Sequence, residues 1–395
     1  MRRFPTRSWR GRVTRGSFVK STTLRSAVGV VVAGAVSAVL LPASAAGAAT
    51  PRAATVDKAT ADAFGRVAAA VLTERTEALV DGRPARRIAG RTGQKAGLSA
   101  RTIRTEGDGV SSLRTRKKRL AALGEVYTAG DTKVSVDGVR VTGARATVRV
   151  TETTTFRYKK IRGDEPATTG FKAHHELGFT AAKGGRWELT GIKATDDGPR
   201  AVNAPAPAPA RTAGVATTTP DAPKASTSWP VRAVPKKRTS YNYAAMAAYS
   251  EKYWRNYNPA YRKFNEAGGD CTNFLSQALK AGGWKPETGG SADYRKWWYE
   301  NTRQSDSWIG VNEWSWYALN SKRVTPLSNV FQMEVGDVLQ MDFDGDGAKD
   351  HSMMTTYRSG YGMPYLTYHS TNTYRKSMAS ILASYPDAVY FAYRT

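Results

Sequence analysis

Cysteine is the scarcest residue of this chain, because Cys271 is the single cysteine among 395 residues. One thiol excludes an intramolecular disulfide, so it must either be buried or take part in chemistry. Histidine is also scarce: the chain has four. Only His351 and His369 lie in residues 240–395. A reaction that needs an imidazole in that part of the chain therefore has two candidates.

The N-terminal apolar run is too short for a typical membrane span. It extends from Ala27 to Leu41, about fifteen residues where a spanning helix needs about twenty. Basic residues precede it, no acid does, and small residues follow it at A-x-A spacing. Residues 1–49 are therefore predicted to be a signal peptide for general secretion. Twin-arginine export, suggested by Arg2-Arg3, and an uncleaved anchor are the alternatives. The mature protein is predicted to be extracellular or associated with the cell wall, without a stable membrane span.

Acidic residues are in short supply only in the first part of the chain. Residues 50–239 carry 35 Lys/Arg and 18 Asp/Glu, whereas residues 240–395 carry 16 and 15. The second part also holds 7 of the 10 Trp and 17 of the 19 Tyr. The basic part lacks interleaved aromatic residues, so a specific nucleic-acid partner is not predicted. Attraction to an anionic cell-wall surface fits a secreted protein, and a solvated basic face is the alternative.

Residues 50–195 are predicted to form a small basic α+β domain of unknown role. Apolar residues at helical spacing predict an amphipathic helix over 55–80, and a short helix through Leu120–Leu123. From residue 124 the period changes to two, which predicts about four antiparallel strands ending near Ala194. His174 and His175 are adjacent in one strand and point to opposite faces, so a shared metal is not expected.

Residues 196–239 are predicted to be a linker, because they are rich in Pro, Ala and Thr and lack an apolar period. Ala-Pro repeats favour polyproline II, which makes a semi-stiff spacer. Residues 240–395 form the second predicted domain. It is expected to begin with a helix over 243–257 and to end in strands over 338–341, 351–357, 365–369 and 388–393.

Cys271 lies at the start of a predicted helix in this second domain. Gly268-Gly269-Asp270 precede it, apolar residues follow at three- and four-residue spacing, and Gly282-Gly283 end the pattern. Free N–H groups and the helix dipole at such a position favour a thiolate and lower its pKa. The alternative is a small buried hydrophobic residue without a reaction.

Residues 240–395 resemble the amidase domain family of bacterial secreted proteins, within the NlpC/P60 superfamily of papain-like cysteine hydrolases. The resemblance is carried by Gly269–Phe274 (GDCTNF), Val335–Val338 (VGDV), Asp350–Ser352 (DHS) and Tyr368–Asn372 (YHSTN). It implies an α+β fold in which a nucleophile helix packs on an antiparallel sheet. It also implies a catalytic set of Cys271 as nucleophile, His351 as general base and His369 as third polar residue, with Asn372 as rival for the third position.

An acidic loop replaces the short hairpin expected before His351. Asp342, Asp344 and Asp346 stand at alternate positions, Gly347 follows the third, and Asp350 closes the loop as a further candidate ligand. This pattern is the opening half of a calcium loop, although Met353 stands where a bidentate Glu is expected. No cofactor is required by the predicted reaction. A structural calcium ion is one prediction for the loop, and a solvated acidic turn is the alternative.

The predicted function is cysteine-dependent hydrolysis of an amide bond, with a peptide or peptidoglycan-like substrate. The backbone N–H of Cys271 is suited to hold the oxyanion, and Asn258 and Tyr257 are candidates to complete the hole. One alternative is a catalytically silent module of papain-like fold that binds wall or protein. Another is acyl transfer to an amine, which the sequence does not distinguish from hydrolysis.

Overall fold

The computed structural model describes residues 56–82, 95–205, 222–229, 233–236, 241–265 and 270–395. The predicted signal peptide, the Ala-Pro repeats and the Gly268-Gly269 turn lie outside the described residues. Within the described ranges, no helix combines the length and the apolar character that crossing a membrane requires.

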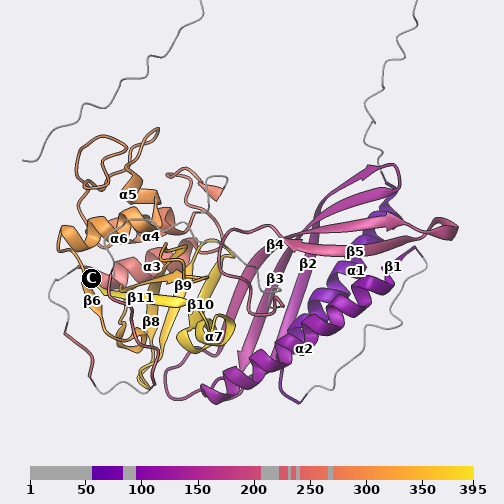
Figure 1. Ribbon diagram of the computed structural model, residues 1–395, viewed down its shortest axis with the longest axis horizontal. Helices are drawn as coiled ribbons and strands as arrows, with labels where there is room; N and C mark the ends of the chain where they lie inside the picture. The colour runs from indigo at the N-terminus through magenta and orange to yellow at the C-terminus, as the bar shows by residue number, and fades with distance from the viewer. Residues whose placement is uncertain (1–55, 83–94, 206–221, 230–232, 237–240, 266–269) are drawn as a thin grey trace, which may run out of the picture. The chain divides into compact units, whose positions relative to one another are not determined.

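The first part of the described chain is a curved meander of strands with two helices on one face (Figure 1). The predicted helix and strands are confirmed. The elements are α1 (Lys58–Glu77), β1 (Ala96–Leu98), α2 (Ala100–Ala122), β2 (Tyr127–Thr142), β3 (Arg145–Tyr158), β4 (Thr168–Ala181), η1 (Lys183–Gly185) and β5 (Trp187–Ala194). β2, β3, β4 and β5 pair antiparallel in chain order, and β1 pairs parallel with β5.

Helix α2 is much longer than the short helix predicted around Leu120. Its buried stripe includes polar side chains as well as apolar ones, so an apolar period does not reveal it. Glu106 is buried because Arg75 of α1 forms a two-pronged ion pair with it, at 2.7 and 2.8 Å. Arg116 is buried because its guanidinium donates to the carbonyls of Val202 and Ala204. A buried ion pair and a guanidinium hydrogen-bonded to carbonyls thus replace hydrophobic residues along this helix.

The second part of the described chain begins with helices and ends with strands. Its elements are α3 (Tyr243–Tyr253), α4 (Cys271–Ala281), α5 (Asp306–Ile309), α6 (Val311–Asn320), β6 (Thr325–Leu327), η3 (Val330–Gln332), β7 (Val338–Asp342), β8 (His351–Arg358), β9 (Pro364–Tyr368), β10 (Thr373–Ser377), α7 (Met378–Ser384) and β11 (Val389–Arg394). The strand order is β10-β9-β8-β7-β11-β6, with antiparallel neighbours. The architecture is compatible with the predicted α+β class.

Two hydrophobic cores lie on opposite faces of this sheet. On one face α4 packs against β8, together with a group of buried tryptophans that includes Trp284, Trp297, Trp308 and Trp314. On the other face α7 covers side chains such as Met341, Met353, Leu366 and Tyr368. The side chains of β8 alternate between these cores, since successive strand residues point to opposite faces. The face on which a β8 side chain lies therefore decides whether it can reach α4.

Parts of the predicted linker are packed against both halves. Asn203 is buried and donates to Thr76 and Glu152 of the first part. Ala225 donates its N–H to the Tyr390 carbonyl in the second part. In addition, β4 pairs with β10 through Phe171 and Gly170. The described ends of the predicted spacer therefore pack against the folded protein. They can do so because apolar and hydrogen-bonding residues flank the Pro-rich stretch.

Candidate active site

Cys271 is the first residue of α4 and is 5% exposed. Its sulfur lies 3.6 Å from the Thr272 hydroxyl, and the main-chain N–H of Ser352 also hydrogen-bonds to it. Burial raises the pKa of this thiol, the N–H of Ser352 lowers it, and the nearby Asp270 charge raises it. Burial dominates, so the helix-start effect expected from the sequence does not prevail. The thiol therefore needs a base to become a nucleophile.

Next to Cys271, the side chain of Asp270 is paired with His369. Asp270 Oδ2 lies 3.0 Å from His369 Nδ1, and each side chain is 1% exposed. The other ring nitrogen, Nε2, lies 3.0 Å from the Tyr253 carbonyl oxygen. Both partners are acceptors, so both hydrogen bonds form together only when the ring carries two protons. The pair is therefore an imidazolium–carboxylate contact when both bonds are made.

Aromatic rings and buried amides fix the position of this pair. The His369 ring stacks on Phe274 of α4, with centroids 3.9 Å apart and planes at 15°, and the Tyr257 ring lies 4.2 Å away. Asp270 Oδ1 accepts hydrogen bonds from the Phe264 N–H and the Asn273 amide. These contacts leave the carboxylate and the imidazole little freedom. Sequence analysis placed Asp270 only as a polar residue before the helix; its position directly before the single thiol was the available signal.

His351 starts β8, but its ring lies on the opposite side of the sheet from α4. It pairs with Met341 in the register, and its ring is 5.3 Å from the Tyr368 ring in the α7 core. The next residue, Ser352, faces α4 and lies 3.1 Å from the Thr272 hydroxyl. The main chain at His351 thus adjoins Cys271, while the side chain does not.

The His351 ring is fully enclosed and electrically neutral near pH 7. Burial lowers its pKa to about 3, and the charges of His369 and Lys376 act in the same direction. Within the described residues, its Nε2 atom has no hydrogen-bond partner, and no hydrogen bond joins the Cys271 sulfur to either imidazole. Of the predicted set, His369 is linked to Cys271 only through the neighbouring residue Asp270, to which the sequence assigned no catalytic role.

The remaining predicted residues surround His369 or support α4. The side chain of Asn372 hydrogen-bonds to the Tyr257 hydroxyl, which also donates to Asn265. Burial raises the pKa of the Tyr257 phenol. Asn258 donates to the Tyr249 hydroxyl at 2.9 Å, and its own side-chain oxygen accepts the Ala260 N–H. Both groups of the Asn258 amide are thus used within the protein, while Tyr257 lies beside the imidazole.

The acidic loop brings three of its four predicted ligands together. Carboxylate oxygens of Asp342, Asp344 and Asp350 lie within 4.8 Å of one another, and Asp346 is not part of that group. Burial, with the charges of the neighbouring aspartates, raises the pKa of Asp350 to about 6. Asp342 already accepts the N–H groups of Gly345 and Gly347. The three carboxylates suit a hard cation such as calcium, although backbone N–H groups also satisfy some of their oxygens.

One comparison with known proteins is located in the second half of the chain. Residues 240–393 match the family model described as "Putative amidase domain". Over 140 residues the chain is 34% identical to the uncharacterized protein YhbB of Bacillus subtilis (strain 168), covering 34% of this chain and 44% of that protein. It is likewise 34% identical over 140 residues to the uncharacterized protein YjcM of the same strain, covering 33% of this chain and 31% of that protein. The matches thus span less than half the length of these curated relatives.

A solved structure, the intermembrane space region of the chloroplast protein ARC6, also matches. It is 21% identical, with 36% of this chain and 98% of that chain covered, and the TM-score is 0.23. That score is too low to support an argument about fold. The family match therefore carries the comparison: residues 240–393 are similar to an amidase domain, and this similarity indicates amide hydrolysis as the chemistry of that part of the chain.

Proposed function

We propose that this chain is a cysteine-dependent amide hydrolase with Cys271 as its nucleophile. The observation that carries the proposal is the buried pair of Asp270 and His369 at the start of α4, directly beside the single thiol. A thiol, an imidazole and an orienting carboxylate are the parts that nucleophilic catalysis by cysteine requires. The amidase-domain match at 240–393 supports the same chemistry.

In this proposal His369 is the general base and Asp270 is its positioning residue. This differs from the roles expected from the sequence, where His351 is the base and His369 or Asn372 the third residue. The support is the hydrogen bond from His369 Nδ1 to Asp270, together with the enclosure of the His351 ring in the α7 core. His351 remains the alternative base, because its main chain adjoins the sulfur and its Nε2 has no partner among the described residues.

The reaction proceeds through a thioester. The first step requires the neutral ring, in which Nδ1 keeps its proton on Asp270 and Nε2 carries none and has released the Tyr253 carbonyl; this Nε2 then accepts the Cys271 proton. The thiolate attacks the amide carbon, and a C–S bond forms while the carbonyl oxygen becomes an oxyanion. Collapse breaks the C–N bond, and the imidazolium gives its proton to the leaving amine. Water then attacks the thioester, releasing the acid and restoring the thiol.

The main-chain N–H of Cys271, at the free N-terminus of α4, is the proposed donor to the oxyanion. Of the two side chains expected to complete the hole, Tyr257 is the better supported. Its ring lies 4.2 Å from His369, and as a donor its hydroxyl would have to leave Asn265; the Asn258 amide would have to leave Tyr249 and lies beside Ala260 instead. The phenol proton of Tyr257 is retained at neutral pH, because burial raises its pKa.

We further propose that the protein is secreted and that its substrate is an amide bond of cell-wall peptidoglycan. The support is the signal-peptide pattern of residues 1–49 and the excess of basic residues in 50–239, which favours an anionic surface. Purified cell wall incubated with the protein should release new free amino groups. The Cys271→Ala variant should release none while keeping its melting temperature. Equal release by this variant would disprove the cysteine mechanism.

A second candidate is a binding module of the same fold without turnover. Two observations favour it: burial raises the thiol pKa, and no imidazole hydrogen-bonds to the sulfur within the described residues. The two candidates differ in thiol reactivity. An iodoacetamide probe that labels Cys271 rapidly near pH 7 in the presence of cell wall supports the enzyme, and the absence of labelling together with wall binding supports the module.

For the acidic loop we propose a structural calcium ion held by Asp342, Asp344 and Asp350. The support is their mutual distance, since carboxylate oxygens of all three lie within 4.8 Å of one another and carboxylates are ligands that calcium prefers. The ion would hold the segment that leads into His351 and Ser352. It has no role in the proposed reaction steps.

A further inference from the structure

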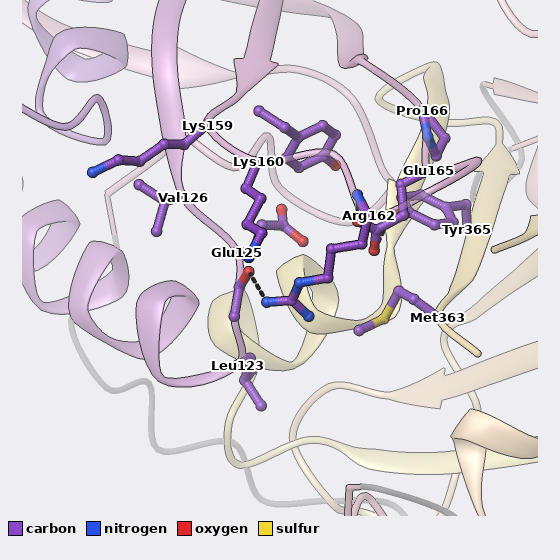
Figure 2. Close-up of a pocket in the computed structure, with 12 residues that line it drawn as sticks. Leu123, Glu125, Val126, Lys159, Lys160, Arg162, Glu165, Pro166, Met363 and Tyr365 are labelled. Atoms are coloured by element: carbon purple, nitrogen blue, oxygen red, sulfur yellow. Dashed lines mark hydrogen bonds between the residues drawn. The ribbon is translucent and has the colours of Figure 1, made fainter. Parts of the chain in front are cut away.

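A pocket lies away from Cys271, where three segments meet. They are the turn between α2 and β2, the loop between β3 and β4, and the start of β9 (Figure 2). The cavity has a volume of about 510 Å³, within the range of small-molecule sites. Met363 and Tyr365 line it at the start of β9, whereas His369 follows the other end of that strand. The pocket is therefore separate from the candidate active site.

Two cationic side chains are available to a ligand in this pocket. Among the described residues, no hydrogen bond or ion pair engages the Lys160 ammonium group. Arg162 makes one long hydrogen bond, 3.4 Å, to the Gly124 carbonyl, and its guanidinium lies 4.5 Å from the centre of the Tyr361 ring. Figure 2 shows both side chains directed toward the turn at Leu123–Glu125. A third cation, Lys159, is committed to Asp81 at 2.7 Å.

The two carboxylates that line the pocket are occupied by other parts of the protein. Glu125 accepts the hydroxyls of Tyr127 and Ser377. Glu165 accepts the Arg162 N–H at 2.8 Å and the Tyr365 hydroxyl at 3.5 Å. Neither carboxylate forms a salt bridge to Lys160 or to the Arg162 guanidinium within the described chain. The lining thus holds the cations Lys160 and Arg162, and within the described chain no salt bridge ties either of them to these two carboxylates.

A buried hydroxyl adds a second polar group. Tyr158, at the end of β3, lines the pocket and is 9% exposed, and its hydroxyl has no hydrogen-bond partner within the described residues. The Thr169 hydroxyl, which lies toward it, donates its own proton to the Tyr374 carbonyl. A buried hydroxyl without a partner is costly, and a ligand oxygen would satisfy it. Leu123 and Met363 supply an apolar wall.

We propose that this pocket binds a small organic anion, whose carboxylate or phosphate group is held by Lys160 and Arg162 and also accepts the Tyr158 hydroxyl. An apolar portion of the ligand lies against Leu123 and Met363. The inference does not depend on the proposed hydrolysis, because the pocket shares no residue with the candidate active site. It gives the basic first part of the chain a defined ligand site in addition to general attraction to anions.

The test is calorimetric titration of the full chain carrying Cys271→Ser, so that turnover plays no part. Glycerol 3-phosphate and N-acetylmuramic acid serve as phosphate and carboxylate probes, and glycerol as the neutral control. We expect at least one anionic probe to bind, no heat from glycerol, and weaker binding as salt is raised. The probe that binds identifies the anionic group. Failure of both anionic probes to bind at millimolar concentration would overturn the proposal.

Three variants and one matched control locate the site. Lys160→Gln and Arg162→Gln should each weaken binding roughly ten-fold or more, since each loses a charge-assisted hydrogen bond. Tyr158→Phe removes only the hydroxyl and should weaken binding by a few-fold. Lys183→Gln, an exposed lysine on the turn between β4 and β5, should bind like the parent. Lys160 is exposed and unpaired within the described chain, so its variant should fold. Unchanged binding in Lys160→Gln and Arg162→Gln, or equal weakening in Lys183→Gln, contradicts the assignment.

Discussion

The Nδ1 atom of His369 lies 3.0 Å from Oδ2 of Asp270, and both side chains are 1% exposed. A buried hydrogen-bonded pair of this kind is costly to break from one side only, because the remaining polar group loses its partner. The pair also borders the thiol, since Asp270 directly precedes Cys271. A change that breaks the hydrogen bond between Asp270 and His369 is therefore expected to affect both the stability of the protein and the proposed reaction.

Asp270→Asn should lower both stability and activity. Removing the carboxylate leaves the imidazole without its charged partner, which costs roughly 3–5 kcal/mol in unfolding free energy for a buried pair. The value of kcat/KM should fall at least about a hundred-fold, with a shifted pH profile, because the ring loses its orienting group. Denaturant unfolding and amide-hydrolysis assays measure the two effects. Asp387→Asn, an exposed aspartate, is the control, and an Asp270→Asn enzyme with the parent pH profile would argue against the positioning role.

His369→Gln and His351→Gln separate the two candidate bases. If His369 is the base, its replacement should abolish turnover, while His351→Gln should retain most of it because the ring lies in the α7 core. Rates are compared at several pH values after both variants are shown to be folded by circular dichroism. The reverse outcome, with activity lost only in His351→Gln, would restore the assignment expected from the sequence.

Acid should destabilise the protein through His351. Its folded pKa is about 3, against a reference value of 6.5, so the unfolded chain takes up the proton first as the pH falls. Stability from this group is present above pH 6.5 and is lost progressively down to about pH 3. Between pH 6.5 and pH 5 the loss is about 2 kcal/mol. Urea unfolding at both pH values measures it, and His351→Gln should flatten the slope.

The Cys271 thiol should be slow to react at neutral pH in the absence of substrate. Burial raises its pKa, so the thiolate fraction and the labelling rate with iodoacetamide should increase as the pH is raised toward 10. Mass spectrometry of the labelled chain gives the rate directly, since no second cysteine competes. A rate already at its plateau near pH 7 would show that the thiol is ionised there.

Calcium should raise the melting temperature if the acidic loop binds it. Millimolar calcium should stabilise the folded state by a few degrees relative to a chelator, because ligand binding to the folded state alone adds stability. Asp344→Asn should remove the shift, and Asp387→Asn should keep it. The same melting temperature with calcium and with chelator would exclude a structural calcium ion in this loop.

Periodicity predicted much of this fold, because α1, α4 and the strands of the meander carry apolar residues at helical or alternating spacing. The full length of helix α2 was not predicted, because the polar residues Glu106 and Arg116 occupy buried positions of its inner face. Strand β10, Thr373–Ser377, was not predicted because it is short and polar. The single thiol was found from its position at a helix start. The sequence did not predict the face of the sheet on which the His351 side chain lies. A shift of one residue along β8 moves a side chain to the other face, and tertiary packing decides that register.

The pairing of β4 with β10 has a consequence for work on isolated fragments. Strand β10 hydrogen-bonds to β9 on one side and to β4 on the other. A fragment restricted to residues 240–395 would leave the β4 side of β10 unpaired, and exposed strand edges promote edge-to-edge association. Such a fragment is expected to self-associate or aggregate at concentrations where the whole chain stays dispersed. By pairing with β10, strand β4 of the basic first part therefore also protects a strand edge that would otherwise promote aggregation.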